Sequence, residues 1–288
     1  MTSPPLNEII AQVQQAINED IGSQTNSTFS GLDVTASLIP NSKIVTAKLI
    51  SREDAILCGQ TWFDTAFQCL DKKITLQWFF KDGDALKEND IVCEISGSAQ
   101  NILTAERTAL NFLQTLSATA TQTHDYVKAL EGLECKILDT RKTLPGLRIA
   151  QKYAVACGGG VNHRIGLYDM VLIKENHIHA AGSIQKAVEL ARKNFSGLKI
   201  EVEVENLSEL KLALENNVDR VLLDNMDVDT LKEAVKINKH QTDLEASGNI
   251  TLKSVRSIAE TGVDYISTGA ITKNIQAIDY SLLFIDDV

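Results

Sequence analysis

Ile200-Glu201-Val202-Glu203-Val204-Glu205 decides the fold, because valine and glutamate alternate along this stretch. A period of two predicts a β-strand with one apolar face and one acidic face. If the apolar face meets helices, the glutamates point into the interior of a sheet, where they need cations because an unpaired buried charge is costly. The alternative is an edge strand with a solvated acidic face, which a position in the middle of an array of strands disfavours.

Short apolar stretches alternate with amphipathic ones on both sides of this strand. We expect strands at Cys135–Asp139, Met170–Lys174, Lys199–Glu205, Arg220–Asp224, Asp243–Ala246 and Tyr265–Ser267. We expect helices at Ser183–Phe195, Leu207–Asn216, Val228–Asn238 and Leu252–Thr261. This alternation indicates parallel strands in a barrel or a doubly wound sheet. The sequence has neither the Gly-x-Gly-x-x-Gly pattern after a strand nor a P-loop motif, so we expect a barrel.

The first part of the chain follows a different pattern. Apolar residues recur at helical spacing between Leu6 and Ile17, which predicts an amphipathic helix. Residues 43–101 alternate between strand-like and short helical stretches and indicate an α+β layer. A long helix with Thr104 as its N-cap is expected to follow. We interpret the end of the chain, residues 284–288, as a final strand or a tail.

Composition and charge limit the classes of partner. The 28 Lys+Arg against 38 Asp+Glu give a net charge of -10, so neither a nucleic acid nor an anionic membrane surface is expected as a partner. No apolar run approaches the roughly 20 residues of a membrane-spanning helix. The 5 Cys form no Cys-x-x-Cys pair and no export signal precedes them, which indicates reduced thiols. We therefore expect a soluble, cytoplasmic protein.

A basic segment stands out against this negative charge. Asp139 is the only acid between positions 139 and 164, whereas the same segment contains Arg141, Lys142, Arg148, Lys152, His163 and Arg164. Arginine forks match carboxylates, and lysine meets phosphates as a point charge. The segment therefore indicates a site for a multiply anionic ligand, with scattered surface charges as the alternative.

Polar or small residues also follow the other predicted strands. In a β/α barrel the carboxyl ends of the strands meet at one face, where the active site lies. The residues expected there are Lys174, Glu203, Asp224, Ser247, Gly248, Thr268 and Gly269. The small residues of the last two strands would let backbone N–H groups approach a phosphate, although plain turns are the alternative.

Seven motifs in one order carry a resemblance to a known family. They are Glu106-Arg107-Thr108-Ala109-Leu110-Asn111, Asp139-Thr140-Arg141-Lys142-Thr143, Pro145-Gly146-Leu147-Arg148, Asn162-His163-Arg164, Leu172-Ile173-Lys174-Glu175-Asn176-His177, Glu201-Val202-Glu203-Val204 and Leu223-Asp224-Asn225. Over nearly its whole length the chain resembles the quinolinate phosphoribosyltransferases, a type II phosphoribosyltransferase family. Thr115 stands where the family often has arginine, which we expect to weaken one anion contact. Leu144 replaces a threonine that is usual in the family, and Ala118-Thr119 replaces a common Gly-Ile. We interpret both differences as changes of packing.

The resemblance implies an α/β subunit of two domains. An N-terminal α/β sandwich would cover residues 1–115, completed by 273–288, and an incomplete, open TIM-like α/β barrel would cover 116–272. It also implies a homodimer, or a larger assembly of such dimers, in which the partner's N-terminal domain caps each barrel and the active sites are shared. Mg²⁺ is the implied cofactor.

The reaction implied by the resemblance is part of de novo NAD biosynthesis. Quinolinate and phosphoribosyl pyrophosphate would give nicotinate mononucleotide, pyrophosphate and CO₂. The carboxylates of quinolinate would be held by Arg141, His163, Arg164 and the partner's Arg107. This use of the basic segment agrees with its reading as a site for a multiply anionic ligand.

The remaining site residues fit the phosphates and the ribose. Lys142 and Lys174 would meet the phosphates, and Glu203 and Asp224 would bind ribose hydroxyls or Mg²⁺ and stabilise positive charge on the ribose. We take these two lysines and two acids as the catalytic residues. The small residues at 247–248 and 268–269 would contribute backbone contacts.

Other functions remain open at this point. The main alternative is a barrel lyase or aldolase that uses Lys174 as a Schiff base, which requires a lysine with a lowered pKa. A second alternative is a catalytically inactive sensor of phosphorylated metabolites. A third is a related enzyme acting on nicotinate, although the number of cations favours a dicarboxylate.

Overall fold

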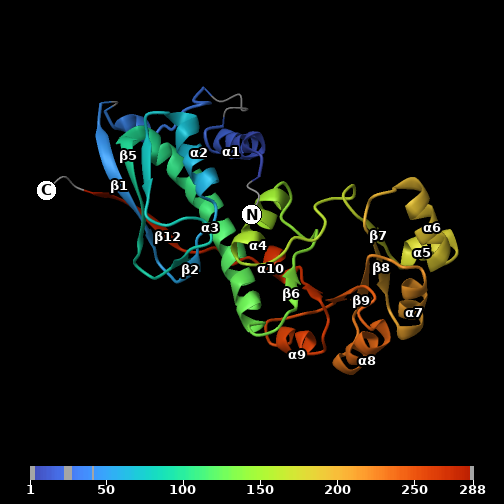
Figure 1. Cartoon of the computed structure of the whole chain (residues 1–288). Coiled ribbons are helices and arrows are strands. Elements are labelled where there is room, and N and C mark those ends of the chain that lie inside the picture. The colour runs from blue at the N-terminus through green and yellow to red at the C-terminus, as the bar shows by residue number, and fades with distance from the viewer. Residues whose placement is uncertain (1–3, 23–27, 41, 286–288) are drawn as a thin grey trace. The chain divides into compact units, whose positions relative to one another are not determined.

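The computed structural model of the chain describes residues 4–22, 28–40 and 42–285. These residues form two compact units. The first contains the described residues up to Gln122, Ile149–Gly158 and the chain from Ile275 onward, and the second contains Thr123–Arg148 and Gly159–Asn274. Helix α3 (Ala99–Ala129) runs from the first unit into the second (Figure 1).

A four-stranded antiparallel sheet forms the centre of the first unit. Its strand order is β12 (Tyr280–Ile285), β1 (Ile44–Ser51), β5 (Ile91–Ser98) and β3 (Thr75–Trp78). Strand β12 comes from the end of the chain and pairs with β1 from the start, so the two ends of the sequence build one sheet. The predicted final strand is confirmed as far as Ile285, and residues 286–288 lie outside the described part of the chain.

Two helices supply apolar core residues of this unit together with the sheet. Helix α1 (Leu6–Asp20) buries one stripe, and α2 (Gln60–Leu70) buries Trp62, Phe63 and Phe67. The Trp62 indole N–H donates to Gln12 Oε1 at 2.8 Å, which ties α2 to α1. A short helix, η1 (Ala36–Leu38), and a small ladder of β2 (Ala55–Ile56) with β4 (Ala85–Leu86) complete the unit.

The expected start of α3 at Thr104 is wrong, because the helix begins at Ala99. Thr104 lies inside the second turn, where its hydroxyl is 3.0 Å from the carbonyl oxygen of Gln100, one turn earlier. Threonine in a helix often satisfies its hydroxyl in this way, so the residue type alone does not mark a cap.

Six parallel strands form the sheet of the second unit. Their order is β6 (Lys136–Leu138), β11 (Tyr265–Ser267), β10 (Asp243–Ser247), β9 (Arg220–Asp224), β8 (Ile200–Val204) and β7 (Val171–Ile173). All neighbouring pairs are parallel. Among the described residues β6 and β7 do not pair with each other, so the sheet curls into a barrel that stays open on that side. The predicted open α/β barrel is confirmed.

Helices follow the strands along the chain. These helices are α5 (Glu175–Ala181), α6 (Ile184–Asn194), α7 (Leu207–Glu215), α8 (Val228–Asn238), α9 (Val255–Ala259) and α10 (Ala270–Lys273). Capping side chains fix where three of them begin. Ser183, Asn206 and Asp227 each accept a backbone N–H from the first turn of α6, α7 and α8. Because these caps satisfy otherwise unpaired donors, they set the helix starts at the ends of the strand-to-helix loops. Figure 1 shows α7, α8 and α9 outside the sheet.

Strand β8 lies in the interior of the sheet, between β7 and β9, so the alternative of an edge strand is excluded. Val202 and Val204 are completely buried. Glu201 and Glu203 lie on the opposite face by strand alternation, and Glu201 is completely buried as well. The acidic face of the predicted strand therefore points into the barrel.

Helix α4 (Arg148–Cys157) was not expected from the sequence. By its contacts it belongs to the first unit, although it follows the first barrel strand along the chain. Gln151 and Lys152 are buried on it beside Ala150, Ala154 and Val155, so polar residues interrupt its apolar face. Lys152 is thus part of the core of the first unit.

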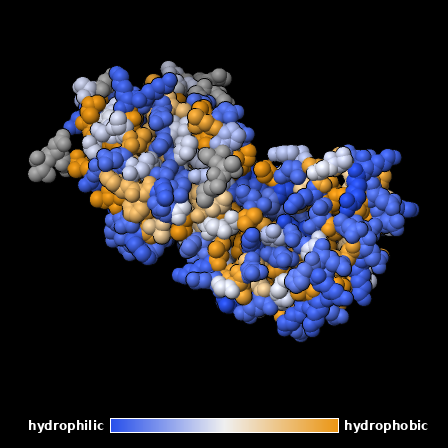
Figure 2. Space-filling model, in the orientation of Figure 1, coloured by the Kyte–Doolittle hydropathy of each residue, from blue (hydrophilic) through white to orange (hydrophobic). Residues whose placement is uncertain are grey.

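No helix in the described ranges is long and apolar enough to cross a membrane. On the face shown in Figure 2, hydrophilic and hydrophobic residues are interspersed over both units.

Strand β12 offers a direct test of the first unit's core. Tyr280 is 4% exposed and its hydroxyl is 3.1 Å from Ser117 Oγ, whereas Leu283 on the same strand is 48% exposed. We expect Tyr280→Ala to lower the free energy of unfolding by about 3–5 kcal/mol and Leu283→Ala by less than about 1 kcal/mol. Both tryptophans, Trp62 and Trp78, lie in this unit, so urea unfolding followed by tryptophan fluorescence reports on it. Equal effects of the two substitutions would contradict this packing.

Candidate active site

A pocket of about 650 Å³ opens at the carboxyl ends of the barrel strands. This is the face where β/α barrels carry their active sites. Its lining residues all belong to the second unit; they are Thr140, Arg141, Lys142, His163, Arg164, Leu172, Lys174, Glu203, Leu222, Asp224, Asn225, Glu245, Ser247, Gly248, Asn249 and Ser267. The lining is mainly polar and charged, with acids and bases side by side, which suits a small, highly charged ligand.

The structure brings together nine of the twelve predicted site residues. Those that line the pocket are Arg141, Lys142, His163, Arg164, Lys174, Glu203, Asp224, Ser247 and Gly248. Thr268 is buried behind the lining, where its hydroxyl donates to the carbonyl oxygen of Ile250. Gly269 lies against Lys142, because a Cβ on this glycine would be 2.8 Å from Lys142 Cδ. Arg107 is exposed on α3 in the first unit and is not among the lining residues.

Two arginines crowd one part of the pocket. Burial and the positive charge of Arg141 lower the pKa of Arg164. One guanidinium nitrogen of Arg164, Nη1, donates to the carbonyl oxygen of Met170 at 3.1 Å, which directs the side chain. Like charges held close together are costly unless an anion lies between or beside them. The pair therefore indicates an anion-binding position.

Lys142 is held at the end of β6 by its backbone. Its N–H donates to Thr140 Oγ1 at 3.0 Å, and its carbonyl oxygen accepts the Thr272 hydroxyl at 2.8 Å. Gly269 lies against the stem of the lysine, and the exposed side chain lines the pocket. Arg148, another member of the basic segment, bonds instead to Thr143 and to the Ile165 carbonyl oxygen, outside the lining.

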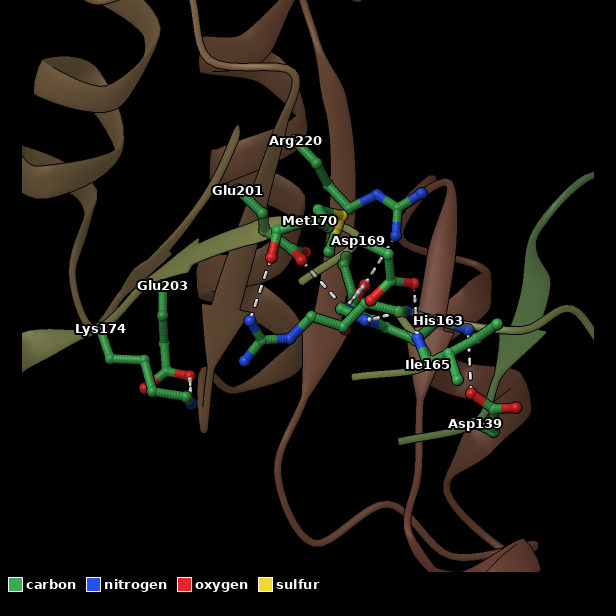
Figure 3. Close-up of polar contacts among 11 residues, drawn as sticks. Asp139, His163, Ile165, Asp169, Met170, Lys174, Glu201, Glu203 and Arg220 are labelled. Atoms are coloured by element: carbon green, nitrogen blue, oxygen red, sulfur yellow. Dashed lines mark hydrogen bonds and ion pairs between the residues drawn. The ribbon is translucent and has the colours of Figure 1, made fainter. Parts of the chain in front are cut away.

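Lys174 and Glu203 form an ion pair across the pocket mouth (Figure 3). Lys174 follows β7 and Glu203 lies on the neighbouring strand β8. The lysine side chain is 45% exposed. A Schiff-base lysine needs a free amine in an apolar or cation-rich site, whereas Lys174 is partly exposed and ion-paired with a carboxylate. The geometry therefore disfavours the lyase alternative.

Asp224 is fixed at the end of β9 by its neighbour. Asn225 Nδ2 donates to Asp224 Oδ2 at 2.7 Å, and Asn225 N–H donates to the Ser247 carbonyl oxygen at 2.9 Å. Gly248 has a φ of 108°, and a Cβ there would be 3.0 Å from Asn225 Cα. Only glycine fits this turn without strain, so Asn225 and Gly248 together lock the acid to the loop after β10.

Glu203 and Asp224 are suitable donors for a hard divalent cation. Mg²⁺ binds one or two carboxylates, keeps several waters and takes further oxygens from substrate phosphates. Each of these carboxylates has one nitrogen partner, Lys174 or Asn225, and a carboxylate offers about four lone-pair positions. The donor set therefore fits Mg²⁺.

A charged cluster at the base of the pocket is formed by Glu201, Glu245, His163 and Arg220, of which His163 and Glu245 line the pocket. Glu201 and Glu245 are completely buried on β8 and β10. His163 Nε2 is 2.9 Å from Glu201 Oε2 and 3.5 Å from Glu245 Oε2, and Arg220 Nη1 is 3.2 Å from Glu245 Oε2. Burial raises the pKa of Glu201. Burial, followed by the charge of Glu201, raises the pKa of Glu245 to about 7.

The segment that carries His163 is held from a second side by Asp139. This buried carboxylate at the end of β6 accepts Asn162 Nδ2 at 2.6 Å and the His163 backbone N–H at 2.9 Å. His163 Nδ1 in turn accepts the backbone N–H of Arg164 at 2.7 Å. Figure 3 shows His163 between Asp139 and the strands that carry Glu201 and Arg220.

Several residues of the site were missed in the sequence. Glu245 precedes Ser247 by two positions on β10 and thus shares its face, a signal that strand alternation could have supplied. Asn225 directly follows Asp224, and its φ of 54° gives it a role that its residue type alone does not reveal. Arg220 begins β9, where a charged residue is usually solvated. Its role is visible only from its contacts with Glu245 and with the Tyr265 ring, 4.2 Å away.

Comparisons with known proteins agree over almost the whole chain. The family model described as "Quinolinate phosphoribosyl transferase, N-terminal domain" matches residues 33–117, and the model of the C-terminal domain matches residues 119–283. A probable nicotinate-nucleotide pyrophosphorylase (carboxylating) from Synechocystis is 41% identical, covering 93% of this chain and 89% of the relative. One from Bacillus subtilis is 39% identical and covers 87% of each.

Solved structures show the same likeness. The nicotinate-nucleotide pyrophosphorylase from Francisella tularensis superposes with a TM-score of 0.94 at 47% identity, covering 98% of both chains. That from Ehrlichia chaffeensis superposes with a TM-score of 0.90 at 37% identity, covering 99% of this chain and 100% of the other.

Glu245 predicts a pH dependence of stability. A glutamate whose native pKa is raised from 4.5 to about 7 keeps its proton when the unfolded chain has already lost it, so native stability falls as pH rises through this range. The loss attributable to Glu245 is about 3 kcal/mol at 1.36 kcal/mol per unit of pKa. Glu245→Gln removes the titrating group. Its stability, measured by urea unfolding at a series of pH values, should therefore fall less than that of the wild type.

The control for this measurement is Glu260→Gln, at an exposed glutamate of the same unit. This variant should keep the wild-type slope. A Glu245→Gln variant with the same slope as the wild type would show that Glu245 titrates normally in the folded protein.

Proposed function

Because the chain belongs to the quinolinate phosphoribosyltransferase family, we propose that its barrel pocket divides between a clamp for quinolinate and a site for phosphoribosyl pyrophosphate. The reaction transfers phosphoribosyl to quinolinate with loss of CO₂, giving nicotinate mononucleotide in NAD biosynthesis. The observation that carries the assignment is the crowding of Arg141 and Arg164 beside the acids Glu203 and Asp224 in one pocket.

Quinolinate binds at the arginines. It is a pyridine with two adjacent carboxylates, and two guanidinium groups at one position supply two forks for them. Arg141 is exposed toward the pocket, whereas Arg164 is half-buried and directed by Met170. One mobile and one fixed cation would hold the ring so that its nitrogen faces the ribose carbon to be attacked.

Phosphoribosyl pyrophosphate binds at the lysines and acids. Lys142 and Lys174 meet its phosphates, and the loop at Ser247–Gly248 offers backbone N–H groups to the same substrate. Departure of pyrophosphate leaves positive charge on the ribose carbon and ring oxygen. The carboxylates of Glu203 and Asp224 stabilise that charge, because they are held in place before the reaction begins.

Decarboxylation then follows from the chemistry of the ring. Bond formation to the ribose makes the pyridine nitrogen cationic, so the carbon beside it can accept the electron pair that CO₂ leaves behind and then take a proton from water. The protein's part is to release one carboxylate while holding the other. The half-buried Arg164 would hold one carboxylate, and the solvent-accessible Arg141 would release the other.

Mg²⁺ is the proposed cofactor, held by Glu203 and Asp224 together with oxygens of the substrate. When bound, it would neutralise charge on the departing pyrophosphate. The proposal rests on the donor set of these two carboxylates.

Arg107 and the assembly belong to the proposal as well. Arg107 is exposed on α3 and lies in the unit that does not contain the pocket. We infer a homodimer in which the partner's Arg107 reaches the quinolinate position. The compartment stays a prediction: we expect the cytoplasm, whereas plant relatives are named as chloroplastic or mitochondrial proteins.

Substrate identity can be tested by CO₂ release. The purified protein with Mg²⁺ should release CO₂ from carboxyl-labelled quinolinate only when phosphoribosyl pyrophosphate is present, because the carbon cannot accept electrons before the nitrogen is alkylated. Nicotinate has one carboxylate and would release pyrophosphate but no CO₂, so its use is followed by pyrophosphate release. It should be used at least about a hundredfold less well than quinolinate, as expected when a charged group of the site loses its partner. Equal use of nicotinate would overturn the dicarboxylate clamp.

The shared site can be tested by mixing inactive variants. Arg107→Ala and Lys142→Ala homodimers should each be inactive. After subunit exchange, each hybrid dimer holds one intact site and one doubly defective site. Random pairing makes half of the dimers hybrid, so about a quarter of wild-type activity should return. Exchange without any recovery would show that Arg107 does not serve a neighbouring subunit's site.

A further inference from the structure

The charged cluster at the base of the pocket calls for a physical explanation. Glu201 Oε1 and Glu245 Oε1 are buried and have no hydrogen-bond partner among the described residues, whereas Glu201 Oε2 lies 2.9 Å from His163 Nε2. Two carboxylates without full hydrogen bonding in the middle of a barrel are costly, and a cluster of apolar residues of the same size would cost less. The chain nonetheless holds both of them directly beneath residues of the proposed quinolinate clamp.

The hydrogen bond at His163 Nδ1 fixes the state of the ring. Nδ1 accepts the backbone N–H of Arg164 at 2.7 Å, so this nitrogen carries a lone pair and no proton. A histidine with an unprotonated Nδ1 has its one proton on Nε2, which faces Glu201 and Glu245. The imidazole is therefore neutral, and both of its nitrogens are directed at the protein.

This arrangement leaves neither ring nitrogen for a carboxylate of the substrate. It also argues against a metal ion in the triad of His163, Glu201 and Glu245. A metal would need the Nε2 lone pair, but that nitrogen carries the proton. The guanidinium of Arg220, 3.2 Å from Glu245 and stacked on the Tyr265 ring, already supplies a positive charge at this position.

We propose that His163 is a positioning residue for Arg164, and that Glu201 and Glu245 hold His163 in place from below. The proposal rests on the function proposed above and changes one part of it, the expected contact between His163 and quinolinate. Asp139 anchors the backbone at 162–163, the two glutamates anchor the ring, and the ring anchors the backbone N–H of Arg164. The result is an arginine fork that is fixed before the substrate arrives.

Fixing one guanidinium in advance has a clear benefit for binding. An arginine side chain loses much conformational freedom when it pairs with a ligand, and a site that has already ordered it loses less on binding. The cost of the buried carboxylates is then offset by a preorganised clamp. Removing the anchor should weaken quinolinate binding more than phosphoribosyl pyrophosphate binding.

Two substitutions at one position separate positioning from direct binding. Asparagine places an oxygen near the position of Nδ1 and can accept the Arg164 N–H, whereas alanine cannot. We expect His163→Ala to raise the KM for quinolinate about tenfold or more, and the KM for phosphoribosyl pyrophosphate to change less than about threefold in both variants. His163→Asn should recover part of the loss, because it keeps an acceptor for the Arg164 N–H but has no atom that reaches the two glutamates. If His163→Asn is as impaired as His163→Ala, the ring is a substrate ligand and the proposal fails.

The glutamates have their own test. Glu245→Ala should raise the KM for quinolinate in the same direction as His163→Ala, whereas Glu260→Ala, at an exposed glutamate of the same unit, should not. An unchanged KM for quinolinate in folded Glu245→Ala would overturn the role given to the glutamates. Thermal unfolding identifies any variant that fails to fold. If the Glu245→Ala variant does not fold, the comparison of His163→Ala with His163→Asn tests the proposal.

A measurement that does not depend on activity separates failure of this proposal from failure of the proposed function. The chain has 5 His, so nitrogen-15 labelling of histidine gives a spectrum simple enough to assign His163 by its loss in His163→Asn. We expect a neutral ring protonated at Nε2, with and without quinolinate. A charged imidazolium in the presence of quinolinate, or binding of Zn²⁺ that Glu201→Gln abolishes, would overturn it. Absence of wild-type turnover with quinolinate would instead refute the function and leave this geometry standing.

Discussion

Carboxylates on the inner face of a parallel sheet must be compensated by positive charge or by hydrogen-bond donors, and this requirement organises the barrel of the protein. Glu201, Glu203 and Glu245 project inward from strands β8 and β10. Each has a cationic or protonated nitrogen close by: Lys174 for Glu203, Arg220 for Glu245 and His163 for Glu201. Because the compensating groups come from different strands and loops, charge balance draws the ends of the strands together.

The same balance produces the chemistry at the pocket. An acid with a fixed nitrogen partner keeps its direction, which is what stabilisation of a positive ribose requires. An arginine crowded by a second arginine favours an anion beside it, which is what recognition of a dicarboxylate requires. Both arrangements lie in one pocket of the second unit. The glycine at position 248 and Asn225 then fix the acidic side against the loop after β10.

Much of the barrel could be predicted from the sequence, because strand alternation and helix periodicity are local signals. The strand that includes Glu203, the lysine after β7 and the basic segment were all recognisable without tertiary information. Local signals failed where a residue's environment is set by distant neighbours. Lys152 looked like part of the anion site and is buried in the other unit, while Thr104 looked like a cap and lies within a helix. Glu245 was not among the predicted site residues, and it is completely buried on β10.

A crystal structure of the protein with quinolinate bound tests most directly whether charge balance has built a dicarboxylate clamp. The expected result is quinolinate in the barrel pocket, with its carboxylates on the guanidinium groups of Arg141 and Arg164, the His163 ring unmoved, and the pyridine nitrogen facing Glu203 and Asp224. Quinolinate bound outside this pocket, or bound with both carboxylates directed away from the two arginines into solvent, would contradict that assignment.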